Sequence, residues 1–456
     1  MYEDDKAIID AGYKPQLRRS VGFFSSFAIS FSYMSVLTGI VANYGFTLGK
    51  AGGFGVWSWW LVVLGHGLTA LVFAEMAGRT PLAGCAYNWN NRLAGPFIGW
   101  FTGWMTLFAY TVGVAAVTVT IIPLLQSILG YTIDAALGRY LAVALVLLQA
   151  IINIYGVRAA ALTNLVAVSA EIFSMVVFGL LLLVVILVKG HPNIELLTAV
   201  PSEPKPYLPG FLMSVLLGAW TMLGFEGAVD ISEETINVKR VAPRGIISAV
   251  LVCGVIGFLF LAALTLGITD LPATKASDNP LSLIASHYLG GTLTRILLVF
   301  VLISVWACSL VNMTGASRVL FAMSRDKRFF ASKWFQKISN HYVPNIAVWF
   351  VAFCASGFVL LADTATALYS AGAILFILVY FVTVVSFAVN GKKLPPTSSF
   401  SLGFWHWPVV FLAALWLAIE IGILTIPSEF LSGTIATGGV LLVGLVLYLT
   451  TGRKHS

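Results

Sequence analysis

Long apolar segments recur along the entire chain, and this pattern constrains the fold more than any other feature. Each segment is close to the ~20 residues that an α-helix needs to cross a bilayer. Backbone groups have no water to bond in lipid, so segments of this length must be helices rather than barrel strands. Only 10% of the residues are charged, against about 25% in an average soluble domain. The sequence therefore predicts an all-α integral membrane protein in a lipid bilayer.

Twelve transmembrane helices are predicted, and their even number places both ends of the chain on one side of the membrane. No linker long enough to separate domains interrupts them. Their expected ranges are Ser20–Phe46, Phe54–Met76, Gly95–Leu125, Tyr140–Tyr155, Ala160–Val188, Phe211–Val229, Gly245–Ile268, Thr292–Met323, Val343–Leu361, Thr366–Val389, Trp405–Thr425 and Leu431–Thr450.

The basic residues are distributed unevenly between the two predicted sides. Of the 26 Lys and Arg residues, 20 fall on the side of the chain ends and six on the other side. Cytoplasmic loops of membrane proteins carry such an excess, so we expect cytoplasmic N- and C-termini, with residues 1–19 as a cytoplasmic tail. The net charge of +7 follows from this asymmetry and needs no nucleic-acid partner.

The first and sixth predicted helices contain residues that weaken a helix in mid-membrane. The first carries several hydroxyl groups between Ser30 and Gly39, and in the sixth Gly224 and Gly227 flank Glu226. Backbone groups freed at such positions can face a polar cavity. Interrupted helices five apart are typical of the two halves of an inverted-repeat transporter. Close helix packing through small residues explains the same pattern.

Carboxylates inside apolar segments are candidates for function, because a charge in the bilayer is costly. Glu226 is the strongest candidate. Helical spacing predicts that Asp230, Glu233 and Glu234 share its face and form a path for a proton or a cation. For Glu233 and Glu234 we favour the alternative, which is structural ion pairing with nearby Lys and Arg.

Glu171 lies about eleven residues into the fifth predicted helix, ~16 Å along its axis and near mid-membrane. Two interpretations are equally open. The carboxyl group binds and releases a proton, or it stays protonated and bonds to a neighbouring helix. Three other membrane residues receive structural interpretations: His66 as a core histidine with satisfied hydrogen bonds, Glu420 as a packing residue, and Glu75 as the partner of Arg79.

Several protein classes are excluded by missing motifs. There is no phosphate-binding glycine loop of an ATP-driven pump, no arginine ladder of a voltage sensor and no potassium-channel filter. No nucleophile–base pair or metal-ligand cluster stands out. We therefore expect no enzymatic activity, no cofactor and no metal.

Five motifs occur in a fixed order along nearly the whole chain. They are the Pro-Leu-Ala-Gly region Ala74–Tyr87, Gly95–Trp100, Asn153–Arg158, Gly224–Glu226 with its continuation to Ile246, and Arg318–Asp326. Together they resemble the amino acid/polyamine/organocation permeases, a superfamily with a leucine-transporter-like fold. Gly12–Ser20 and Phe27–Ser35 are most similar to the amino acid/choline transporter branch, which includes permeases for γ-aminobutyrate, choline and amino acids.

The resemblance implies a ten-helix inverted-repeat core at residues 20–390, with repeats at 20–189 and 210–390 and discontinuous helices 1 and 6. Helices 11 and 12, in residues 391–456, would be peripheral. The substrate would lie between the interruptions, its carboxylate on amides of helix 1 and its amine on carbonyls of helix 6. The implied substrate-binding residues are Ser32, Tyr33, Met34, Ser35, Tyr110, Ala219, Trp220, Thr221, Met222 and Asn312.

The resemblance also implies proton coupling or gating by Glu171, Glu226 and Trp220. Trp220 is similar to the gating aromatic of the arginine/agmatine antiporter and Glu226 to its proton-responsive glutamate. From the residues alone, a packing role for Trp220 is favoured over stacking on a substrate ammonium.

The chain departs from the family at two positions. Tyr33-Met34-Ser35 replaces the Gly-Ser-Gly that many members carry in the first break, which favours a different substrate shape. Glu171 stands where several proton-coupled members carry a lysine, so it reverses the charge and can bind a cation or carry the proton.

We therefore expect a secondary active transporter of an amino acid or a related small amine such as γ-aminobutyrate. It would work by alternating access with proton coupling in a plasma membrane or bacterial inner membrane. A choline or polyamine carrier and an amino-acid exchanger are the alternatives, and a non-transporting nutrient sensor is a remote one.

Overall fold

The chain is helical throughout the part that the structure describes. This computed structural model describes residues 19, 21–82, 84–155, 157–190, 192–202, 205–340, 343–396 and 399–451. Within these ranges the only β-type pairing is an isolated bridge between Val21 and Thr235. The all-α prediction is confirmed. Residues 1–18 of the tail predicted at 1–19, and the last residues, 452–456, lie outside the described ranges.

Ten helical stretches of the described chain are long and apolar enough to cross a membrane. They contain α2 (Phe23–Met34) with α3 (Val36–Ala51), α4 (Ser58–Arg79), α6 (Pro96–Leu129), α7 (Ala135–Tyr155), α8 (Val157–Phe173) with the π-turn Ser174–Phe178 and α9 (Gly179–Lys189), α14 (Val238–Leu266), α16 (Pro280–Arg325), α19 (Ala365–Asn390), α20 (His406–Thr425) and α21 (Leu431–Thr451).

Two shorter apolar helical stretches coincide with the sixth and ninth predicted spans. The first joins α11 (Tyr207–Met213) to α12 (Val215–Thr221), and the second is α18 (Asn345–Leu361). Every predicted span thus overlaps an apolar helix. Short helices lie in the connections: α5 (Cys85–Ala94), α10 (Glu195–Thr198), α15 (Leu271–Ala276) and α17 (Ser332–Phe335). Another short helix, α13 (Gly227–Asp230), lies at the end of the sixth predicted span.

Glycine and proline explain several helix ends. Pro96 begins α6 directly after Gly95, whose φ is 89°, and Gly130 ends α6 at φ 77°. Proline fits the first turn of a helix, where its missing N–H is not needed, and glycine adopts the left-handed cap. Gly290, at φ 74°, interrupts α16 and separates its first helical part from the segment that was predicted to begin at Thr292.

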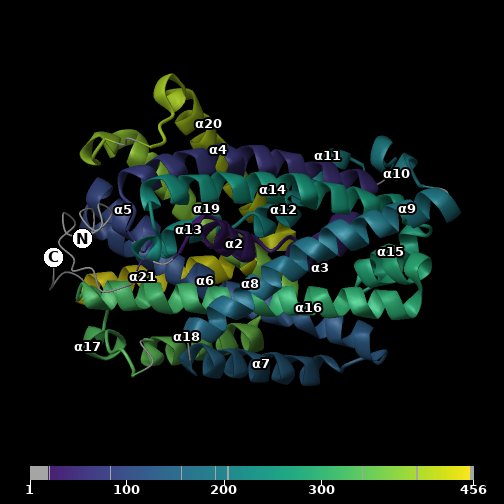
Figure 1. The fold of residues 1–456 in the computed structure, drawn as a ribbon, viewed down its shortest axis with the longest axis horizontal. Helices are drawn as coiled ribbons and strands as arrows, with labels where there is room; N and C mark the ends of the chain where they lie inside the picture. Colours follow the sequence, from purple (N-terminus) through teal and green to yellow (C-terminus); the bar gives the residue numbers. More distant parts are fainter. Residues whose placement is uncertain are drawn as a thin grey trace.

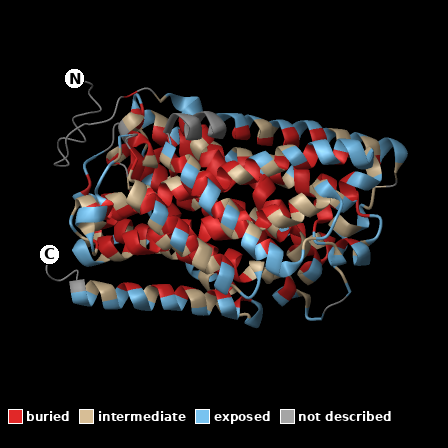
Figure 2. Cartoon of the chain, turned by 90° about the horizontal axis from the view of Figure 1, so that it is seen from below, coloured by how far each residue is buried: buried red, intermediate tan, exposed pale blue. Residues whose placement is uncertain are grey.

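The helices form one elongated bundle in which α4, α14 and α16 run along the long dimension (Figure 1). The connecting helices α5 and α17 lie at one end of the bundle, and α10 and α15 lie at the other. Buried residues gather along the middle of the bundle, and exposed residues cover its outer faces (Figure 2). The last two helices pack on the rest: α20 contacts α4 and α19, and α21 contacts α6 and α19.

Candidate functional site

Two helices are broken near the middle of the bundle, at the positions that the sequence predicts. Between α2 and α3 the chain leaves the helical conformation at Ser35, whose φ and ψ are 28° and 87°. After α12 ends at Thr221, the chain turns at Gly224, whose φ is 81°, before α13 begins at Gly227. Each break exposes backbone groups that a continuous helix would bond internally.

The second break makes one prediction wrong. No single helix carries Glu226, Asp230 and Glu234, because α13 covers only four residues and a 3₁₀ turn follows at Ser232–Glu234. The carboxylates instead have separate partners. The Tyr380 hydroxyl donates to Glu226 Oε2 at 2.7 Å, and Tyr110 donates to Asp230 Oδ2 at 3.3 Å.

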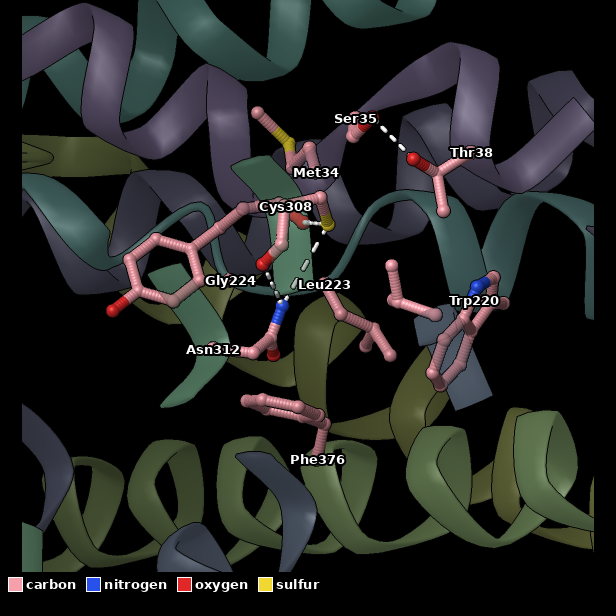
Figure 3. A pocket seen from close by; sticks show the side chains of 11 residues that line it. Met34, Ser35, Thr38, Trp220, Leu223, Gly224, Cys308, Asn312 and Phe376 are labelled. Carbon is pink, nitrogen blue, oxygen red and sulfur yellow. Dashed lines mark hydrogen bonds between the residues drawn. The ribbon is translucent and has the colours of Figure 1, made fainter. Parts of the chain in front are cut away.

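A small cavity lies between the two breaks. Its volume is ≈ 20 Å³, about the space that one or two ordered waters need. In the view of Figure 3, the Trp220 indole and the Asn312 amide lie on either side of Leu223. The cavity is lined by Tyr33, Met34, Ser35, Thr38, Val117, Trp220, Leu223, Gly224, Cys308, Asn312 and Phe376. A cavity of this volume is too small for an amino acid.

The predicted site residues divide into two groups. Tyr33, Met34, Ser35, Trp220 and Asn312 line the cavity, so the structure brings together residues from three distant parts of the chain. The others are buried next to it without lining it: Ser32, Tyr110, Ala219, Thr221 and Met222. Tyr110 lies directly behind Tyr33, with ring centroids 5.3 Å apart.

Sequence reasoning missed six lining residues: Thr38, Val117, Leu223, Gly224, Cys308 and Phe376. Cys308 and Asn312 are one turn apart on α16, and that spacing could have linked Cys308 to a predicted site residue. The Cys308 thiol lies 3.7 Å from the Tyr33 carbonyl oxygen, and Asn312 Nδ2 donates to the Cys308 carbonyl at 2.8 Å. The first contact ties α16 to the residues just before the first break, and the second lies within α16.

Glycines at the second break make room for the Tyr33 side chain. A Cβ atom at Gly224 would lie 2.6 Å from Tyr33 Cβ, and one at Gly227 would lie 2.4 Å from Tyr33 Cδ2. Contacts of this length do not occur between real side chains, so both positions require glycine. The Tyr33 ring therefore lies in a slot on the second break.

Glu171 of α8 is buried at the first break, and its side chain packs against the first turn of α3. The Leu37 amide donates to Glu171 Oε1 at 3.1 Å, and the Ser304 hydroxyl donates to Oε2 at 2.7 Å. Ser35 Oγ also donates to Oε1, at 3.2 Å. The carboxyl group thus joins α8, α3 and α16 through neutral donors and lies where the positive end of a helix dipole favours an anion.

Glu226 is buried at the second break and has a different environment. The Tyr380 hydroxyl that donates to it accepts the Gly224 amide at 2.8 Å, so one tyrosine of α19 bonds to both sides of the turn. Ser30 links α2 to the second break: its hydroxyl donates to the Phe225 carbonyl at 2.7 Å and accepts the Ala228 amide at 2.9 Å. The helix that leads into the first break is therefore hydrogen-bonded to the second break.

His66 of α4 and Glu420 of α20 form a fully buried pair beside the second break. His66 Nε2 lies 2.9 Å from Glu420 Oε2, and His66 Nδ1 lies 3.1 Å from the Met222 carbonyl oxygen. The expectation that His66 has satisfied hydrogen bonds is confirmed. The ion pair predicted for Glu75 and Arg79 is also present.

Two broken helices around a cavity, within a bundle of apolar helices, define a multi-pass membrane protein of the transporter class. A family model for amino acid permeases matches residues 21–448, and the chain belongs to this family. The predicted superfamily is thereby confirmed.

Several known relatives align with nearly all of the chain. "Amino-acid permease BAT1" of Arabidopsis thaliana is 25% identical over 97% of this chain and 94% of its own length. "Amino-acid permease BAT1 homolog" of Oryza sativa subsp. japonica is 28% identical over 97% and 93%. "Branched-chain amino acid permease BcaP" of Bacillus subtilis is 26% identical over 85% and 83%. These similarities indicate a transporter rather than an enzyme.

Proposed function

We propose that this protein is a secondary active transporter of an amino acid or a related small amine, which works by alternating access with proton coupling. The observation that carries the proposal is the cavity between the first turn of α3 and the last turn of α12. A helix N-terminus attracts an anion and a helix C-terminus attracts a cation, so the two ends together suit a solute with both charges. The names of the relatives support the same solute class.

The proposed topology has twelve transmembrane helices, with a 5+5 inverted repeat at residues 20–390 and peripheral helices in 391–456. Both chain ends would be cytoplasmic in a plasma membrane or bacterial inner membrane. The connecting helix α17 and the turn before it carry Arg328 and Lys333, and this segment lies at the same end of the bundle as α5, which carries Arg92. This arrangement agrees with the excess of basic residues expected on the cytoplasmic side.

The lining of the cavity supports a substrate with an apolar portion. Val117, Leu223 and Phe376 present hydrocarbon surface, while hydroxyl groups come from Ser35 and Thr38. A branched-chain amino acid fits this mixture, and γ-aminobutyrate is the smaller candidate. A choline or polyamine carrier, an amino-acid exchanger and a nutrient sensor remain the alternatives.

We assign proton coupling to Glu171, with a gating role for Glu226 and Trp220. Glu171 is 1% exposed, and its described donors are an amide and two hydroxyl groups. An anionic Glu171 would occupy the α3 N-terminus that a substrate carboxylate also needs, whereas a protonated one would release it. Proton binding would thus accompany substrate binding.

The test is uptake into proteoliposomes of labelled leucine and labelled γ-aminobutyrate, with and without an acid-outside gradient, in competition with choline and putrescine. We expect concentrative uptake only with the gradient, and inhibition by carboxylate-bearing amines only. Glu171→Gln should bind substrate but lose the response to the gradient. Glu429→Gln is the matched control, because Glu429 forms a surface ion pair with Lys50.

Three outcomes would contradict the proposal. Gradient-independent uptake that requires internal substrate would identify an exchanger and return Glu171 to a structural role. Saturable binding without flux would identify a sensor. Competition by choline or putrescine in place of amino acids would identify a carrier of amines that lack a carboxylate.

A further inference from the structure

The Glu420–His66 pair joins two parts of the molecule, because α4 belongs to the proposed transport core and α20 lies outside it. Both side chains are 0% exposed. Glu420 Oε1 has no hydrogen-bond partner among the described residues, so His66 provides the only described hydrogen bond of this carboxyl group. A buried polar group in an apolar helix needs an explanation, since burial without full pairing is costly.

The hydrogen-bond partners of His66 show that its Nδ1 atom is protonated. Nδ1 faces the Met222 carbonyl oxygen at 3.1 Å, and a carbonyl can only accept, so Nδ1 carries hydrogen. Nε2 faces Glu420 Oε2 at 2.9 Å, and one proton lies between them on either atom. In both arrangements Glu420 holds the ring in the orientation that donates to Met222.

Met222 is the C-cap of α12, directly after the last helical residue, Thr221. Its own amide donates to Gly218 at 2.8 Å, so it closes the last turn of α12 and its carbonyl is one of those that the break frees. Trp220, two residues earlier, and Leu223, the next residue, both line the cavity. The aromatic rings of Phe225 and Tyr380 lie within 6.3 Å of the His66 ring and close the space around it.

We propose that Glu420 and His66 are positioning residues for substrate binding: they hold the Met222 carbonyl and so set the end of α12 against the cavity. This inference rests on the proposed function of the cavity. It makes α20 part of the binding apparatus, although α20 contributes no lining residue. It also extends the packing role expected for Glu420, because Glu420 acts through His66 on the break.

The test measures equilibrium binding of labelled leucine and labelled γ-aminobutyrate to the purified full-length protein. We expect Glu420→Ala to weaken binding about tenfold, the effect of losing one charge-assisted hydrogen bond. Glu420→Gln should stay within about threefold of the wild type, because its amide still donates to Nε2. Thr69→Val is the matched control, since it removes a buried hydroxyl one turn along α4 that bonds only within the helix.

A double-mutant cycle separates positioning from packing. In His66→Asn the side-chain amide takes the place of Nδ1 as donor to Met222 and no longer contacts Glu420. If Glu420 acts through His66, Glu420→Ala should have no further effect on this background. An undiminished loss in the double mutant, or wild-type binding by Glu420→Ala alone, would overturn the inference.

Failure of the proposed function is distinguishable from failure of this inference. If the wild type binds neither probe, the proposed function fails. ¹⁵N solid-state NMR of histidine-labelled protein, assigned with His66→Asn, then still tests the pair. A hydrogen on Nδ1, together with an Nε2 signal that shifts in Glu420→Ala, would support the proposed hydrogen bonds of His66 to Met222 and Glu420. An unprotonated Nδ1 would overturn the inference.

Discussion

The hydroxyl oxygen of Tyr33 occupies the space over Gly315 of α16, where a Cβ atom would approach it to 2.6 Å. Gly315 has a helical conformation, so an alanine at this position would meet steric conflict without backbone strain. The contact joins the first break to the helix that also carries Cys308 and Asn312.

Gly315→Ala should therefore destabilise the protein by about 1–3 kcal/mol through overpacking. Tyr33→Phe removes the conflicting oxygen, so the double mutant should regain much of the lost stability, as coupled neighbours do. Thermal unfolding of the purified variants measures both effects. Gly357→Ala, in α18 with nothing within 4 Å of its Cβ position, is the control. Additive effects of the two substitutions would show that the contact does not decide stability.

Trp220→Ala should weaken substrate binding by about tenfold, because the indole closes the cavity on the side of Tyr369, with ring centroids 5.4 Å apart. Trp220→Phe should retain part of the affinity. Uptake kinetics of both variants measure the change, and Trp405→Ala, which removes an exposed indole, is the control. Wild-type kinetics in Trp220→Ala would assign this residue to packing.

Cys308 should be protected from small thiol reagents by substrate, because its side chain lines the cavity. The experiment compares a variant that keeps only Cys308 with one that keeps only Cys354, a half-buried residue of α18 outside the cavity. Leucine or γ-aminobutyrate should slow labelling of Cys308 and leave labelling of Cys354 unchanged. Equal rates at Cys308 with and without ligand would place the substrate elsewhere.

Glu75→Ala should destabilise the protein by about 2 kcal/mol, less than the ~3–5 kcal/mol of a fully buried pair, because the Arg79 side chain is 18% exposed. Glu75 is itself buried, accepts the Leu402 amide at 3.3 Å and lies 3.4 Å from His406 Nδ1, so its loss removes a hydrogen-bond partner from both of these groups as well as from Arg79. Glu429→Ala, which breaks the surface pair with Lys50, should cost less than ~1 kcal/mol. Thermal unfolding compares the two, and equal small effects would contradict the buried role of Glu75.

The sequence predicts most of the helices because their signal is local. An apolar run such as that of α19 is visible in its own residues, and the clustered hydroxyls and glycines near Ser35 and Gly224 mark the two breaks. The amphipathic helix α5 was missed because it is too short and too polar to read as a membrane span. The prediction of one acidic helix face was wrong because helical spacing was extended past Asp230, where α13 ends and a 3₁₀ turn follows.

The site was harder to predict, because it is made by packing between distant helices. Nothing in the sequence near Phe376 or Val117 indicates that both face Trp220. The slot for Tyr33 depends on Gly224 and Gly227, which lie far from Tyr33 in the sequence. Likewise, the pairing of His66 with Glu420 joins residues 354 positions apart. Contacts between residues this far apart in the sequence are visible only in the three-dimensional structure.

The small volume of the cavity has different consequences for the affinity of a ligand and for its association rate. A space of ≈ 20 Å³ admits no amino acid, so the cavity must widen before any such ligand can bind. Different substrates should therefore share one upper limit on their association rate, which is set by how often the cavity widens. Selectivity among substrates would then appear almost entirely in their residence times. A weak substrate would differ from a strong one in a faster dissociation rate, not in a slower association rate.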